Sequence, residues 1–157
     1  MAMVRLSRRT SGFTLVELVA TLTIAAILAA AAGPRLFSSQ PFAARGYADD
    51  VAAALRQSRS VAMASGCAVR FTINTGGYSA VQRAASGTHC AASGAWTTPV
   101  LKGDGQRLSS WPPAAANVQS ASTLIFGSDG ALSGGGVSIA IGPHVVAVDS
   151  GGWVQRQ

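Results

Sequence analysis

The sequence predicts an α+β fold, in which a long helical region precedes a series of short antiparallel strands. Two observations predict this class. An apolar run at residues 13–32 and an amphipathic pattern over residues 43–64 both have helical character. After Gly66 the hydrophobic period changes to two, and glycine or proline turns separate short runs that are rich in β-branched residues.

The composition narrows the class of protein further. The chain has 157 residues, of which 48% are hydrophobic and 11% are charged. This length suits one domain, and the high apolar content with low charge argues against disorder and against a coiled coil. Two cysteines are too few for a disulfide-framework miniprotein. The net charge is +6, but three of the twelve basic residues precede the apolar run, so the charge gives weak support for an acidic partner such as nucleic acid.

The apolar run at residues 13–32 is predicted to be a membrane helix. Sixteen of its twenty residues are apolar, and a helix of that length spans about 30 Å, the thickness of the hydrocarbon core of a bilayer. Arg5, Arg8 and Arg9 precede the run with no acid among them. The positive-inside rule therefore places the N-terminus in the cytoplasm and the rest of the chain across the membrane.

Three interpretations of this N-terminus remain open on the residues alone. A secretory signal would be cleaved near the small residues 30–32. A plain membrane anchor would stay uncleaved. Glu17 favours a third interpretation, because a carboxylate inside an apolar segment costs about 2.5–3.5 kcal/mol and is a functional hypothesis by default.

Residues 12–18, Gly-Phe-Thr-Leu-Val-Glu-Leu, resemble the class III signal of type IV prepilins and type II secretion pseudopilins, with a short basic leader before them and an apolar helix after them. The resemblance implies a type IV pilin fold, cleavage between Gly12 and Phe13 by prepilin peptidase on the cytoplasmic side, and N-methylation of Phe13. It also implies that the Glu17 carboxylate pairs with the α-amino group of a neighbouring subunit's first residue, which makes the charge tolerable in an apolar environment.

The same resemblance implies an organisation and a location. Residues 1–12 are the prepilin leader, residues 13–33 the hydrophobic transmembrane and assembly helix, and residues 34–157 a periplasmic pilin-like domain. The precursor is a single-pass inner-membrane protein with its N-terminus in the cytoplasm, and the mature chain joins a pilus or pseudopilus. The implied partners are other pilins or pseudopilins, prepilin peptidase and inner-membrane lipid.

Residues 34–157 are predicted to contain one helix and a series of strands. We expect Pro34 to kink or interrupt the N-terminal helix and Pro41 to be a second break. An apolar stripe at helical spacing predicts a helix over residues 43–64 that packs on the protein's own sheet. Loops are expected at residues 84–94 and 102–117, and strands at residues 67–73, 78–83, 97–101, 123–126, 137–141, 144–148 and 153–155.

Two segments of this half resemble the GspH/FimT family of pseudopilins. One is residues 124–130, Leu-Ile-Phe-Gly-Ser-Asp-Gly, and the other is the amphipathic helix with Leu55, Arg56, Ser60 and Ala64. Within that family, residues 45–47 and 65–69 look most like a minor pilin of mannose-sensitive haemagglutinin (MSHA) pili. The resemblance implies a non-enzymatic structural subunit that takes part in assembly of an MSHA-type pilus. The alternatives are a GspH-like type II secretion pseudopilin and a FimT-like minor pilin that takes up DNA.

The two cysteines are predicted to form a disulfide, because a periplasmic location permits oxidation. A bond between Cys67 and Cys90 would close a loop of about two dozen residues and stabilise the fold by about 3–4 kcal/mol in the chain-entropy model. Free thiols remain the alternative. A metal site of Cys67, His89 and Cys90 matches no known ligand spacing, so we expect no metal.

The sequence gives little support for catalysis. His89 and His144 are far apart, and neither belongs to a motif with an acid and a nucleophile. We therefore predict no enzyme activity and no cofactor.

DNA binding is the main rival function, because some FimT-like pilins take up DNA with a basic C-terminal Gly-Arg-x-Arg pattern. Residues 152–156 read Gly-Trp-Val-Gln-Arg, so Trp153 replaces the first arginine and only Arg156 remains. Non-specific DNA affinity comes from several basic groups, whereas a tryptophan can stack on a base. We expect Trp153 to pack the last strand onto the sheet, with a DNA contact through Trp153 and Arg156 as the alternative.

Overall fold

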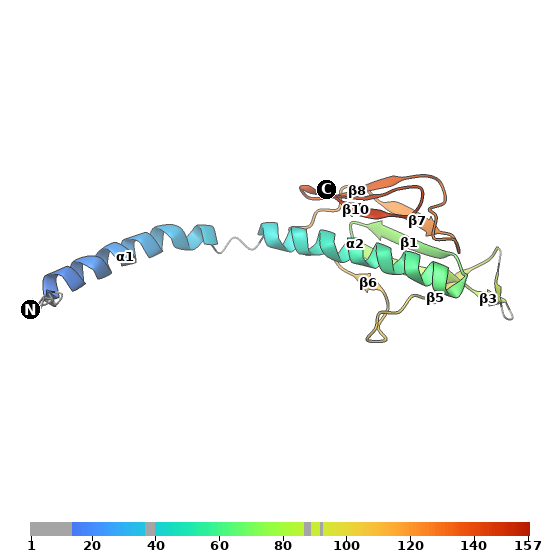
Figure 1. The fold of residues 1–157 in the computed structure, drawn as a ribbon, viewed down its shortest axis with the longest axis horizontal. Coiled ribbons are helices and arrows are strands. Elements are labelled where there is room, and N and C mark those ends of the chain that lie inside the picture. Colours follow the sequence, from blue (N-terminus) through green and yellow to red (C-terminus); the bar gives the residue numbers. More distant parts are fainter. Residues whose placement is uncertain (1–13, 37–39, 87–88, 92) are drawn as a thin grey trace, which may run out of the picture. The chain divides into compact units, whose positions relative to one another are not determined.

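The computed structural model describes residues 14–36, 40–86, 89–91 and 93–157. The chain forms two units, residues 1–38 and 39–157. The first unit contains helix α1 (Leu15–Leu36), and the second contains helix α2 and all of the strands (Figure 1). Helix α1 includes Pro34 and ends two residues later, so the predicted interruption does not occur at Pro34 itself.

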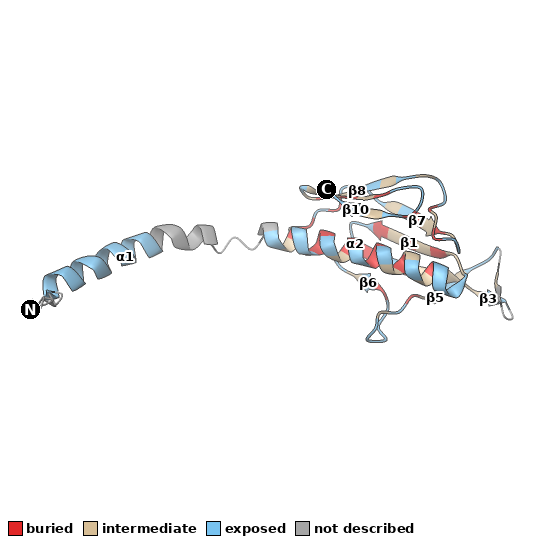
Figure 2. Cartoon of the chain, in the orientation of Figure 1, coloured by how far each residue is buried: buried red, intermediate tan, exposed pale blue. Residues whose placement is uncertain are grey.

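Helix α2 (Gln40–Ser65) carries the stripe predicted from the sequence. It begins three residues earlier than predicted, because Pro41 lies in the first turn, where a missing N–H breaks no helical hydrogen bond. Gly66 follows the helix with a φ of 67°, the left-handed conformation that ends many helices. One face of α2 is buried and the opposite face is exposed (Figure 2); the buried residues are Ala44, Tyr47, Ala48, Val51, Ala52, Ala54, Leu55, Ser58 and Ala62.

The larger sheet is antiparallel and has the order β5-β2-β1-β7, with β6 also paired to β2. Phe71 lies at its centre, opposite Ala80 on one side and Leu124 on the other. The β1–β2 turn needs glycine, because Gly77 has a φ of 119° and a side chain there would collide with the backbone of Ser110. The strands are β1 (Val69–Asn74), β2 (Gly77–Arg83), β5 (Trp96–Pro99), β6 (Ser109–Ser110) and β7 (Ser122–Phe126).

The smaller sheet has the order β10-β9-β8 and is also antiparallel. Its strands are β8 (Val137–Ile141), β9 (His144–Val148) and β10 (Val154–Arg156). A separate pair of two-residue strands, β3 (Ala85–Ser86) and β4 (His89–Cys90), extends beyond β2.

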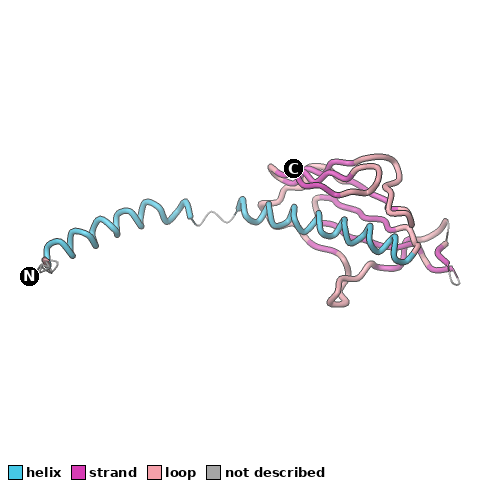
Figure 3. Tube along the Cα trace, in the orientation of Figure 1, coloured by secondary structure: helices cyan, strands magenta, loops and turns pink. Residues whose placement is uncertain are grey.

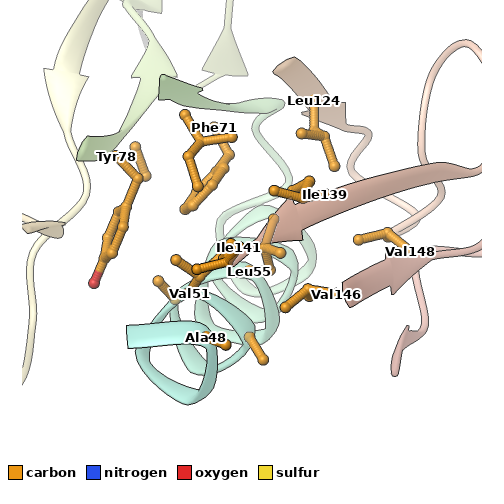
Figure 4. Close-up of a cluster of buried hydrophobic side chains, with 14 of the residues drawn as sticks. Ala48, Val51, Leu55, Phe71, Tyr78, Leu124, Ile139, Ile141, Val146 and Val148 are labelled. Atoms are coloured by element: carbon orange, nitrogen blue, oxygen red, sulfur yellow. The ribbon is translucent and has the colours of Figure 1, made fainter. Parts of the chain in front are cut away.

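The hydrophobic core lies between α2 and the inner faces of the two sheets (Figures 3 and 4). Val51 and Leu55 of α2 are fully buried against side chains from both sheets, including Phe71 of β1 and Ile139 and Val146 of the smaller sheet. The prediction that the stripe packs on the protein's own sheet is therefore confirmed. Alternation of buried and outward residues along β1 and β7 follows the period of two read from the sequence.

The structure corrects two details of the strand prediction. Residues 84–94 and 102–117, expected to be loops, contain the two-residue strands β3, β4 and β6. The strands also divide into two main sheets, which the local pattern does not reveal because pairing joins residues far apart in the sequence.

Candidate functional site

The first turn of α1 is capped by a side chain. Thr14 precedes the helix, and its Oγ1 accepts a hydrogen bond of 3.3 Å from the backbone N–H of Glu17. A threonine followed three residues later by a glutamate has the spacing of a capping box. Glu17 therefore lies in the first turn, where the helix dipole favours a negative charge, and its side chain is exposed.

The apolar side chains of α1 are exposed over residues 15–29, where the structure describes them (Figure 2). The exposed fraction is 78% for Leu15, near the start of the described side chains, and 69% for Ile27, near their end. The other large exposed residues of α1 are Val16, Leu18, Val19, Leu22, Ile24 and Leu28. A contiguous apolar surface of this kind marks a site of interaction with another protein or a membrane. Among the residues that the structure describes, no helix is both long enough and apolar enough to span a membrane.

The predicted processing site lies at the start of this unit. Gly12 and Phe13 are outside the described residues, so cleavage between them and methylation of Phe13 stay predictions. Glu17 is described, but its partner in the prediction belongs to another subunit.

The cysteines form the predicted disulfide. Cys67 and Cys90 are bonded, with their Cα atoms 5.4 Å apart and a sequence separation of 23 residues. This Cα separation is within the usual range for disulfides. The bond ties the segment between α2 and β1 to strand β4, so it closes the loop that contains the β1–β2 hairpin.

The expectation that Trp153 packs the last strand onto the sheet is wrong. The Trp153 residue is 63% exposed and precedes β10. The Arg59 guanidinium, from α2, lies 4.5 Å from the centre of the indole ring, a cation–π contact that holds the ring at the surface. Arg59 also donates a hydrogen bond of 3.1 Å to the carbonyl of Gly130.

Arg156 is three residues after Trp153 and has a partner on α2. Its Nε is 3.0 Å from Asp49 Oδ1 of α2 in a partly exposed ion pair. Arg56 donates a hydrogen bond of 3.2 Å to the carbonyl of Val154. Arg56, Arg59 and Trp153 line a pocket of about 230 Å³. The two α2 arginines are basic groups beside Trp153 that the C-terminal motif did not reveal, because they are distant in the sequence.

The sequence analysis did not predict a polar contact at the edge of the core. The hydroxyl of Tyr78 on β2 donates a hydrogen bond of 2.8 Å to Asp50 Oδ2 on α2. Burial, followed by this hydrogen bond and the charge of Asp50, raises the pKa of Tyr78. The sequence gives one indication of this contact: Asp50 is adjacent to Val51, which belongs to the buried stripe of α2.

Metal and catalytic centres were not expected. In the described part of the chain, no group of three or more histidine, cysteine or acidic residues is placed to hold a metal ion. Cys67 and Cys90 are occupied by their disulfide. His144 begins β9 directly after the Gly142–Pro143 connection, at the end of the β8–β9 hairpin.

Comparison with known families identifies the class. The prokaryotic N-terminal methylation motif matches residues 7–33, which places the chain among pilin-like proteins with a methylation signal. The family described as type II transport protein GspH matches residues 47–152, more than half of the chain. The chain belongs to the GspH family. No curated protein and no solved structure matches the chain.

The family membership explains why the chain has a helical N-terminal unit and a second unit with sheets. A helical N-terminal region followed by antiparallel sheets is the arrangement of the type IV pilin fold, as predicted. The protein has a type IV pilin or pseudopilin role, in assembly of a pilus or pseudopilus with other pilins. Both families are structural components and not enzymes, which agrees with the prediction of no enzyme activity.

Proposed function

We propose that the chain is a minor pilin of an MSHA-type pilus. Prepilin peptidase removes residues 1–12 by cleavage between Gly12 and Phe13, and Phe13 becomes N-methylated. The precursor is held in the inner membrane by the helix at residues 13–33, with its N-terminus in the cytoplasm and residues 34–157 in the periplasm. The exposed apolar surface of α1, together with the match to the methylation motif, supports assembly of the chain into a filament. The resemblance of residues 45–47 and 65–69 to an MSHA minor pilin supports the type of pilus.

Glu17 is the residue that directs assembly in this proposal. An unpaired carboxylate in the hydrocarbon of a membrane costs about 2.5–3.5 kcal/mol. Pairing with the α-amino group of a neighbouring subunit's Phe13 removes much of that cost. Helix α1 places Glu17 in its first turn, close in sequence to the new N-terminus and exposed to a partner.

A substitution of Glu17 tests this role. We expect Glu17→Ala to leave the amount of protein in the membrane fraction unchanged and to reduce its amount in sheared filaments at least about tenfold, because about 1.4 kcal/mol of lost pairing has that effect. Thr21→Ala is the matched control, since Thr21 lies one turn further on and its hydroxyl donates a hydrogen bond to the carbonyl of Leu18 within α1. Incorporation of Glu17→Ala at the wild-type level contradicts the proposed role.

The exposed tryptophan favours a second candidate function, DNA uptake. Trp153 is largely exposed, with Arg59 stacked on one side of its ring, and a base could stack on the other side. Arg56 and Arg59 line the same pocket. The ion pair of Arg156 with Asp49 weighs against it, because that pair already neutralises one cation. A mobility-shift assay with DNA at two salt concentrations separates the two candidate functions. DNA binding that falls with salt, and that is weaker in both Trp153→Ala and Arg156→Ala, supports DNA uptake. The absence of such binding supports a purely structural subunit.

A further inference from the structure

A groove beside the β1–β2 turn is lined only by uncharged residues. Its volume is about 330 Å³, at the lower end of the roughly 300–1,000 Å³ of ligand pockets. Thr72 and Asn74 of β1, Ser79 of β2 and Ser109 of β6 contribute hydroxyl and amide groups to its lining. The consecutive glycines at the turn keep side chains out of the groove.

Trp111 forms one side of this groove and is the most exposed large hydrophobic residue among those described, at 82%. It follows β6 and precedes Pro112 and Pro113, whose fixed φ angles stiffen the loop that carries it. A side chain at Gly76 would contact the Trp111 ring, so glycine leaves the space beside the ring open.

The other two tryptophans differ from Trp111 in their contacts. The guanidinium of Arg83 lies 4.5 Å from the ring centre of Trp96, and that of Arg59 lies 4.5 Å from the ring centre of Trp153. Within the described residues no cation stacks on Trp111. Its exposed indole therefore lacks the cation stacking that the other two tryptophans have.

The polar groups beside Trp111 retain hydrogen-bonding capacity. Asn74 uses its Oδ1 to accept a hydrogen bond of 2.7 Å from the N–H of Gly76, which orients its amide and leaves the amide N–H₂ as a donor. Thr72 and Ser79 are directly opposite each other on β1 and β2, so their hydroxyls come from neighbouring positions. Each hydroxyl can both donate and accept.

We propose that this groove binds a neutral carbohydrate. A sugar ring has an apolar C–H face that can lie on the indole of Trp111, and hydroxyls around its rim that can bond to Thr72, Asn74 and Ser79. An anion is disfavoured because no cationic side chain lines the groove. An apolar ligand is disfavoured because it would leave these polar groups without partners. This site is separate from the helix that assembles the filament, so the inference does not rest on the proposed pilus.

Binding of short sugars to the full chain tests the proposal. The protein is held in a detergent without a sugar headgroup, and mannotriose, chitotriose, cellotriose and maltotriose are titrated in turn by calorimetry. We expect millimolar or tighter binding of at least one trisaccharide, with little change when the salt concentration is raised. Trp111→Ala should weaken that binding about tenfold or more, and the matched control Trp153→Ala should leave it unchanged.

A second variant guards against a folding defect in Trp111→Ala. Thr72→Val keeps the shape of the side chain and removes one hydroxyl on an outward position of β1, so it should weaken binding with the urea midpoint of the domain nearly unchanged. The proposal is overturned if none of the four sugars binds the wild-type chain at about 10 mM. It is also overturned if both Trp111→Ala and Thr72→Val bind as tightly as the wild type.

Discussion

Replacing Tyr78 with phenylalanine tests the polar contact that joins α2 to the larger sheet. Only 4% of Tyr78 is exposed, and its hydroxyl donates a hydrogen bond of 2.8 Å to Asp50. A hydrogen bond to a charged group contributes about 1.5–3 kcal/mol. Asp50 is partly exposed, so water can replace some of the lost interaction. We therefore expect Tyr78→Phe to lower the free energy of unfolding by about 1.5 kcal/mol, the lower end of that range.

Tyr47→Phe is the matched control. The Tyr47 and Tyr78 ring centres are 6.2 Å apart, so both variants remove a hydroxyl from the same region. The Tyr47 hydroxyl is buried and has no hydrogen-bond partner among the described residues. Its removal eliminates a desolvated polar group without breaking a bond, so the free energy of unfolding should stay the same or rise.

Urea unfolding of residues 39–157, followed by circular dichroism at neutral pH, measures both effects. These residues form their own compact unit. Equal m-values for the variants would show that the shift in midpoint reflects stability alone. The reasoning is refuted if the two variants lose the same stability, or if Tyr47→Phe loses more than Tyr78→Phe.

Two further predictions concern the disulfide and alkaline pH. Replacing both Cys67 and Cys90 with serine should lower the free energy of unfolding by about 3–4 kcal/mol, as should reduction of the wild type; a loss below about 1 kcal/mol in urea titrations contradicts the loop-closure account. Burial, and to a smaller extent the charge of Asp50, raises the pKa of Tyr47 from 10.0 to about 12. Since the folded state favours the neutral phenol, this stabilisation is complete below pH 10 and is lost between pH 10 and 12. Tyr47→Phe should make the alkaline decline in the urea midpoint shallower, and an unchanged decline contradicts it.

Helix α2 was predictable because its signal is local. The apolar stripe and the glycine after Ser65 lie within or beside the helix itself, whereas the break expected at Pro41 is absent because Pro41 lies in the first turn. The stripe also indicated packing on a sheet, because Leu55 and its neighbours form an apolar face whose exposure to water is unfavourable. Strands such as β1 and β7 were predictable for the same reason, through their period of two.

The short strands depend on pairing across the sequence. Strand β6 consists of Ser109 and Ser110, which have no strand-like pattern and are extended because they pair with Tyr78 and Ser79 of β2. The division into two sheets likewise follows from long-range registers and not from any one segment.

The surroundings of Trp153 illustrate the same limit at a candidate site. Its place beside the last strand suggested that the side chain packs inward against the sheet. The ring instead stacks on Arg59, which is 94 positions earlier in the chain. The contact exists because α2 lies against β10, and that proximity is a property of the fold. The Asp49–Arg156 ion pair arises from the same proximity.

The central claim is that this GspH-family chain is processed and assembled as a pilin, and the intact mass of the mature protein from cell membranes tests it most directly. The account predicts a chain that lacks residues 1–12, starts at Phe13 and carries one added N-methyl group. A chain that begins after the small residues 30–32, or one that still carries its first twelve residues, contradicts the account.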